Sequence, residues 1–173
     1  MTHPTLGAVQ QTFEYVTNRL RLSHGRMSPH MLEILAAPFD CEWATYWRAD
    51  ANAGVLRAHV RWTKPGIHPT ELEKDTNGRY LSLSEGVAGQ VWRDRAPVWT
   101  TDLVTDMCLP RSLDAKAAGF RRGIWFAVQS ESTVYGVVEL LGQRIEPATR
   151  PLMLAIEQYG FDLGHVMSHT AYK

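Results

Sequence analysis

The chain has 173 residues, and its 18 lysines and arginines balance 18 aspartates and glutamates, so the formal net charge at pH 7 is zero. Hydrophobic residues make up 45% of the chain and charged residues 21%, which excludes an intrinsically disordered protein and fits one compact domain. Nucleic acids and anionic membranes attract proteins with an excess of positive charge, and this chain has none. We therefore expect no nucleic-acid partner.

The sequence also lacks the features of an exported or membrane-bound protein. Its first residues contain no basic stretch followed by an apolar core, so no secretory signal is expected. No apolar run approaches the roughly 20 residues that span a bilayer. We accordingly expect a cytoplasmic protein without membrane insertion, in which Cys41 and Cys108 are reduced thiols.

Two helices are predicted at the start of the chain. Apolar residues at alternating spacings of three and four indicate an amphipathic first helix. They are Leu6, Val9, Phe13, Val16 and Leu20. Ser28 followed by Pro29 is typical of a second helix start, because serine caps the first turn and proline fits the first helical position.

A β-hairpin is predicted next. Two β-prone segments, residues 42–48 and 55–63, flank a turn sequence at residues 50–54. In the first segment Trp43, Thr45 and Trp47 share one face. In the second, the alternation predicts one continuous apolar face, formed by Leu56, Ala58, Val60 and Trp62.

The middle of the chain is less regular. We expect a weak strand around residues 70–75 and a short helix that begins near Ser84 and ends before Pro97. A brief strand at residues 98–100 then leads into an irregular stretch at residues 102–110. This part of the chain is therefore expected to be rich in loops.

Regular structure returns in the last part of the chain. A short helix is predicted at residues 112–118, followed by strands at residues 120–129 and 134–141. The second of these strands is apolar on both faces apart from Glu139, so we expect it at the centre of a sheet covered on both sides. Thr149 caps a long final helix. This order of elements predicts a mainly antiparallel α+β domain.

Short motifs of enzymes are missing from the sequence, including those of serine hydrolases, zinc proteases, P-loop proteins and dinucleotide-binding proteins. His165 and His169 could face one metal ion from the last helix, but no third ligand stands at a recognisable spacing. We therefore expect neither a metal site nor catalytic residues.

Aromatic residues on or beside the predicted strands form a candidate small-molecule site. They either line a cavity or fill the core, and the pattern leaves both interpretations open. Glu139 favours a cavity, because a carboxylate within an apolar strand needs a partner if it is buried. The candidate ligand-binding residues are Tyr46, Trp62, Trp99, Cys108, Arg111, Arg121, Trp125 and Glu139.

Several segments, taken in order, resemble the sequence pattern of GAF domains. These segments are LSEGVAGQVW at 83–92, APVWTTD at 96–102, Pro110-Arg111, AAGFR at 117–121 and YGVVEL at 135–140. The resemblance covers roughly residues 28–167 and looks most similar to GAF domains of bacterial sensor histidine kinases and related two-component proteins. It implies one GAF-like domain over residues 1–173, with an N-terminal helix (1–27), a sheet with pocket loops (28–148) and a C-terminal helix (149–173).

The resemblance implies a central antiparallel sheet of about five to six strands, with the terminal helices on one face and a ligand pocket on the loop-rich face. It also implies a homodimer formed through those helices. Bilin-binding members commonly have His or Tyr after the attachment cysteine, whereas Leu109 follows Cys108, so no covalent bilin is expected. Methionine-sulfoxide-reducing relatives need several loop cysteines, which Ala88 and Cys108 cannot supply.

The function expected from this resemblance is a non-enzymatic sensory domain that binds an unidentified small molecule and signals through its terminal helices. Two alternatives stay open. One is a ligand-free GAF domain that serves for dimerisation or as a structural module. The other is a thiol-based redox or chromophore-binding domain that uses Cys108. The residues do not identify the ligand or any cofactor.

Overall fold

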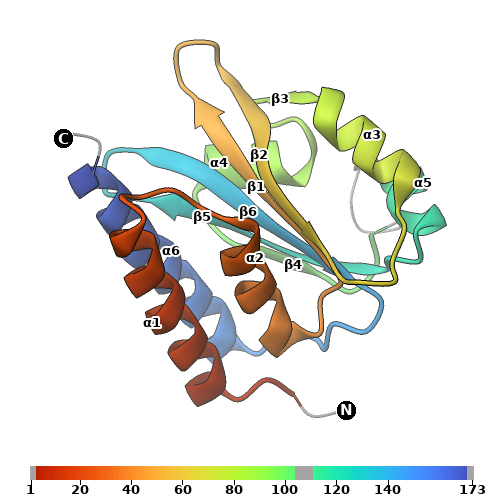
Figure 1. Cartoon of the computed structure of the whole chain (residues 1–173), viewed down its shortest axis with the longest axis horizontal. Helices are drawn as coiled ribbons and strands as arrows, with labels where there is room; N and C mark the ends of the chain where they lie inside the picture. The colour runs from red at the N-terminus through yellow and green to blue at the C-terminus, as the bar shows by residue number, and fades with distance from the viewer. Residues whose placement is uncertain (1–2, 104–110, 171–173) are drawn as a thin grey trace.

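A computed structural model describes residues 3–103 and 111–170 and places helices on both faces of a six-stranded sheet (Figure 1). The strand order is β3-β2-β1-β6-β5-β4, and each pair of neighbours is antiparallel. The strands are β1 (Trp43–Asp50), β2 (Val55–Thr63), β3 (Tyr80–Ser82), β4 (Val98–Thr100), β5 (Arg122–Gln129) and β6 (Val134–Gly142). The predicted α+β architecture with an antiparallel sheet is confirmed, and β6 lies between β1 and β5 as its apolar faces indicate.

The helices form two layers. Helices α1 (Leu6–Leu22), α2 (Pro29–Ala36) and α6 (Arg150–Thr170), with the 3-10 turn η1 (Ala37–Phe39), cover one face. Helices α3 (Thr70–Gly78), α4 (Gly86–Asp94) and α5 (Ser112–Ala117) cover the other. We call these the terminal-helix face and the α3–α5 face. None of the described helices is both long enough and apolar enough to cross a membrane.

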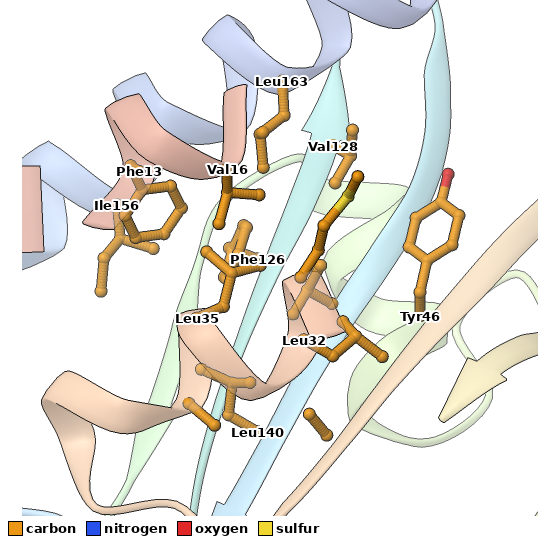
Figure 2. Close-up of a cluster of buried hydrophobic side chains, with 14 of the residues drawn as sticks. Phe13, Val16, Leu32, Leu35, Tyr46, Phe126, Val128, Leu140, Ile156 and Leu163 are labelled. Carbon is orange, nitrogen blue, oxygen red and sulfur yellow. The ribbon is translucent and has the colours of Figure 1, made fainter. Parts of the chain in front are cut away.

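The terminal-helix face is apolar throughout its centre. Figure 2 shows Phe13 and Val16 of α1 pointing toward Ile156 and Leu163 of α6, with Phe126 beneath them. The predicted face of the first helix is confirmed at Val9, Phe13, Val16 and Leu20, which are all buried. Burial of this apolar surface, at roughly 25 cal/mol per Å², is the main favourable contribution to this half of the fold.

Helices α1 and α6 lie side by side and run in the same direction (Figure 1). His3 lies near Glu146, close to where both helices begin. The rings of Phe13 and Tyr159 stack halfway along, with centroids 4.5 Å apart. Gly25 lies against Thr170 where both helices end. The two helices therefore form a parallel pair along one side of the molecule.

Residues 70–75 are helical, so the strand predicted there is wrong. They form most of α3, whose first turn contains Glu71 and Glu73. Leu72 and Thr76 are its buried residues, and their spacing of four places them on one side of a helix. Acidic residues in the first turn also favour a helix, because they complement its positive N-terminal dipole.

The predicted continuous apolar face of β2 is also wrong, because β2 contains a bulge. Tyr46 pairs with Val60 while Trp47 pairs with Ala58, which leaves His59 as the additional residue. An extra residue reverses the face to which later side chains point. Leu56 and Ala58 consequently pack on the α3–α5 face, whereas Val60 and Trp62 pack on the terminal-helix face.

Candidate functional site

Glu139 is a fully buried carboxylate at the centre of the α3–α5 face. It lies on β6, directly opposite Thr45 of β1 and Trp125 of β5. Its Oε1 accepts a hydrogen bond from Trp43 Nε1 at 3.2 Å, and its Oε2 accepts one from Trp125 Nε1 at 2.9 Å. Two neighbouring strands therefore hold the carboxylate with indole N–H groups.

The charge of Glu139 is balanced by Arg111, which stands at the start of α5. The guanidinium donates to Glu139 Oε2 at 2.5 Å and to Thr76 Oγ1 of α3 at 2.8 Å. It also lies over the ring of Trp47, 4.9 Å from the ring centroid, where the cation is attracted to the aromatic face. Only 3% of the Arg111 side chain is exposed, so this is a buried ion pair.

Two more polar atoms are buried in the same layer. Thr45 Oγ1 and Trp47 Nε1 have no hydrogen-bond partner among residues 3–103 and 111–170. A buried polar group without a partner costs about 1–3 kcal/mol. We refer to the residues described so far as the Glu139 cluster, which comprises Trp43, Thr45, Trp47, Thr76, Arg111, Trp125 and Glu139.

Ionic contacts on α3 flank the Glu139 cluster. Arg79 donates two hydrogen bonds of 2.8 Å to Asp75. The pKa of Asp75 lies below its usual range, mainly because of these hydrogen bonds, and the positive charges of Arg79 and Arg111 add to the effect. A second guanidinium, that of Arg61, lies 5.3 Å from the ring centroid of Trp43.

The structure brings together three of the residues predicted for the site. Glu139, Trp125 and Arg111 are in direct contact through hydrogen bonds. The expectation that a buried Glu139 has a partner is met by three donors, from Trp43, Trp125 and Arg111.

Three other predicted site residues lie on the terminal-helix face and do not reach Glu139. Tyr46 and the partly buried Trp62 and Trp99 pack with the cluster formed by α1, α2 and α6. Burial raises the pKa of the Tyr46 hydroxyl, which donates to the backbone oxygen of Tyr135 at 3.1 Å. Trp99 borders a separate hollow of about 270 Å³. We therefore leave these residues out of the candidate site.

Of the remaining predicted residues, Arg121 is exposed, and Cys108 lies outside the described residues. The other cysteine, Cys41, is buried on the terminal-helix face. Burial raises the pKa of its thiol, and the negative charges of Asp40 and Glu42 raise it further. Burial and these charges therefore disfavour the thiolate form of Cys41, and the sheet separates this residue from the Glu139 cluster.

The sequence pattern did not place Trp43, Trp47 and Thr76 in the candidate set. Alternation along β1 puts Trp43 and Trp47 on one face, which the structure confirms. Only the pairing of β1 with β6 shows that this face is the one that carries Glu139. Thr76 has no comparable signal, since it directly follows residues 70–75, for which the sequence pattern predicts a strand and not a helix.

No family model matches the sequence, and no curated protein matches it either. Solved structures do match over nearly the whole chain. The GAF domain of an Acinetobacter phosphoenolpyruvate-protein phosphotransferase superposes with a TM-score of 0.65 at 14% identity and covers 95% of each chain. The nlh2 GAF domain of A. aeolicus has a TM-score of 0.64 at 14% identity and covers 93% of this chain and 98% of its own. The chain adopts a GAF fold.

The same GAF fold also occurs in an enzyme among the similar structures. The free methionine-R-sulfoxide reductase of Neisseria meningitidis, solved with its substrate, has a TM-score of 0.66 at 13% identity. It covers 92% of this chain and 90% of its own. Because one fold carries different activities, the function has to be argued from the residues of the site.

Proposed function

We propose that this GAF domain is a sensory module of a bacterial two-component signalling protein, in which a small molecule binds at the Glu139 cluster. The observation that carries the proposal is a buried ion pair within an apolar layer, between Arg111 and Glu139. Burying two charges costs several kcal/mol of desolvation for each ion, and apolar side chains of similar volume often stabilise a core equally well. A recognition role explains why charged groups stand here.

The unpartnered atoms of the Glu139 cluster support the same proposal. Thr45 Oγ1 and Trp47 Nε1 are buried without hydrogen bonds in the described part of the chain. A ligand with polar groups can pair with both atoms and so recover the free energy that their burial costs. Sites for small molecules commonly combine aromatic walls with a few such polar groups.

The arrangement of layers offers a route from the Glu139 cluster to the terminal helices. Trp125 contacts Glu139 from one face of β5, and α6 packs on the other face of the same strand. A ligand shifts the equilibrium between two arrangements of a protein only if it binds them with different affinity. We propose that occupancy changes the packing of α6 and α1 in a homodimer.

We propose further that the domain is not an enzyme. Cys41 is a buried thiol on the terminal-helix face, and burial raises its pKa, which makes it a poor nucleophile. A thiol cycle that forms a disulfide needs two cysteines within about 7 Å of each other between their Cα atoms. The burial of Cys41 and its raised pKa argue against a part for this thiol in such a cycle.

A second candidate function is a ligand-free structural module. It is favoured by the burial of the Glu139 cluster, where Trp43, Trp47 and Trp125 are fully buried and Arg111 is 3% exposed. In this alternative the protein's own side chains occupy the site permanently, and the domain serves only to hold two copies together.

Two experiments distinguish the sensory module from the ligand-free structural module. They are native mass spectrometry of freshly purified protein and a thermal-shift screen of small polar metabolites. A sensory module gives either a bound molecule or a compound that raises Tm. Trp47→Phe keeps an aromatic ring, although a smaller one, and removes the indole N–H, so it should weaken this binding. Trp99→Phe on the opposite face is the matched control and should leave it unchanged. A chain that carries no molecule and responds to no compound contradicts the sensory proposal.

A further inference from the structure

We propose that the ligand of the Glu139 cluster is a cation, with a guanidinium or alkylammonium group that takes the place of the Arg111 side chain. This inference rests on the proposed function and specifies the chemistry of the ligand. In the present structure Arg111 then acts as an intramolecular occupant of the cation site, and a ligand binds by displacing it.

The parts of the site that belong to the sheet favour a positive charge. Strands β1, β5 and β6 supply one fully buried carboxylate, Glu139, together with the rings of Trp43, Trp47 and Trp125. A carboxylate beside aromatic faces attracts cations both by its charge and by the quadrupole of the rings. Strands β1, β5 and β6 therefore form a cation-binding surface, and the cation that pairs with Glu139 comes from Arg111, outside the sheet.

The observed contacts of two arginines follow this preference. Arg111 pairs with Glu139 and lies over Trp47, and Arg61 lies over Trp43. Each of these two tryptophans thus has a guanidinium within about 6 Å of its ring centroid, the range of a cation–π interaction.

Arg111 is held by contacts that a cationic ligand can make in its place. Among residues 3–103 and 111–170, the Arg111 side chain contacts the sheet through the hydrogen bond to Glu139 and the stacking on Trp47, and it donates a further hydrogen bond to Thr76 of α3. A molecule that removes Arg111 without replacing its charge leaves Glu139 buried and unpaired, which is strongly unfavourable. A cation avoids that penalty, whereas a neutral molecule or an anion does not.

Methylguanidinium tests the inference, because it matches the end of an arginine side chain. We expect saturable binding to the Arg111→Ala variant, seen as a rise in Tm relative to the same concentration of sodium chloride. Wild-type protein should bind the probe about tenfold more weakly or worse, because Arg111 must first leave the site. The double variant Arg111→Ala/Glu139→Gln should not bind it.

A measurement on the wild-type protein keeps the test valid if Arg111→Ala does not fold. The indole N–H signals of Trp43 and Trp125, whose groups donate to Glu139, should shift with methylguanidinium in a ¹H–¹⁵N spectrum. The signal of Trp99, on the other face, is the internal control. Tetramethylammonium tests whether an alkylammonium group is accepted as well.

Three results would overturn the inference. The first is the absence of a Tm rise in folded Arg111→Ala together with unchanged indole signals in the wild type. The second is equal binding by the Glu139→Gln double variant, and the third is stabilisation of the wild type by acetate, which assigns the site to anions that bind Arg111. A bound molecule that is neutral or anionic would refute the cation inference and leave the sensory proposal intact.

Discussion

At the scale of single residues, the buried pair of Arg111 and Glu139 makes each partner depend on the other. The carboxylate is fully buried and the guanidinium nearly so, and the two groups form an ion pair. Removing one charge from such a pair leaves the other uncompensated in an apolar surrounding, which costs more than the pair contributes to stability.

We predict that Glu139→Gln lowers the free energy of unfolding by about 3–5 kcal/mol, because it leaves a buried positive charge on Arg111. The double variant Arg111→Met/Glu139→Gln should recover much of the loss, since neither charge is left. Urea denaturation of the wild type, the single variant and the double variant measures the loss of stability and its recovery. The matched control is Glu131→Gln in the exposed turn between β5 and β6, which should change stability by less than about 0.5 kcal/mol.

A pH-dependent contribution to stability is expected from Asp75. Its pKa in the folded protein is lowered, chiefly by the hydrogen bonds from Arg79, whereas the unfolded value is about 3.9. The contribution is therefore complete above about pH 4 and is lost as the pH falls through the folded pKa. Asp75→Asn should be less stable than the wild type at pH 7, and the difference should shrink below pH 4. A difference that stays constant down to pH 2 would contradict this prediction.

At the scale of helices and strands, helix α6 approaches β5 more closely than side chains would allow. A Cβ atom at Gly160 would overlap the carbonyl oxygen of Ala127, and one at Gly164 would overlap the backbone of Gln129. Glycine is needed at both positions for this reason, and both are buried residues of α6.

We predict that Gly160→Ala destabilises the protein by about 1–3 kcal/mol, because the added methyl group forces α6 away from β5. Gly7→Ala in α1 is the matched control, since nothing lies within 4 Å of that position. It should be neutral or stabilising by up to about 1 kcal/mol, as expected from helix propensity. Thermal and urea unfolding of both variants test the prediction, which fails if the two substitutions have equal effects.

The elements that sequence patterns predict well are those with local signals. Ser28 caps α2 by accepting a hydrogen bond from the backbone N–H of Met31, as its neighbour Pro29 indicates. The bulge at His59 gives no such signal. Apolar residues stand at every second position of β2 both before and after His59, so the sequence shows the pattern of a regular strand. Only the partner strand reveals that the faces are exchanged.

The candidate site could be predicted in part, where a residue carries a local signal. A buried carboxylate in an apolar strand requires a partner, and this reasoning identified Glu139. The choice between Arg111 and Arg121 as its partner depends on tertiary structure, since 28 positions separate Arg111 from Glu139. Alternation along one strand likewise cannot show that Tyr46 and Trp125 lie on opposite faces of the sheet.

At the scale of the whole molecule, the parallel pair of α1 and α6 leaves apolar side chains on its outer surface. Tyr15 and Leu22 of α1 are 48% and 75% exposed, and Leu154 of α6 is 58% exposed. Tyr15 and Leu22 are seven residues apart and therefore lie on the same side of α1. These residues are candidates for contact with a second copy.

We predict that light scattering after size-exclusion chromatography gives about twice the chain mass of 19.5 kDa. The double substitution Tyr15→Asp/Leu22→Asp should yield a monomer that remains folded, because both side chains are exposed. Leu113→Asp on α5 is the control on the opposite side of the molecule, where Leu113 is also exposed, and should leave the dimer intact. A wild-type monomer at high concentration would contradict the homodimer proposal.

The close contact between α6 and β5 has a mechanical consequence. Where side chains separate a helix from a sheet, small displacements are absorbed when those side chains change rotamer. At Gly160 and Gly164 the backbones of α6 and β5 are in direct contact, so no side chain lies between them to take up a displacement. Ala127, which touches Gly160, is two residues from Trp125 along β5. A displacement of the strand at Trp125 would therefore carry α6 with it as one stiff body.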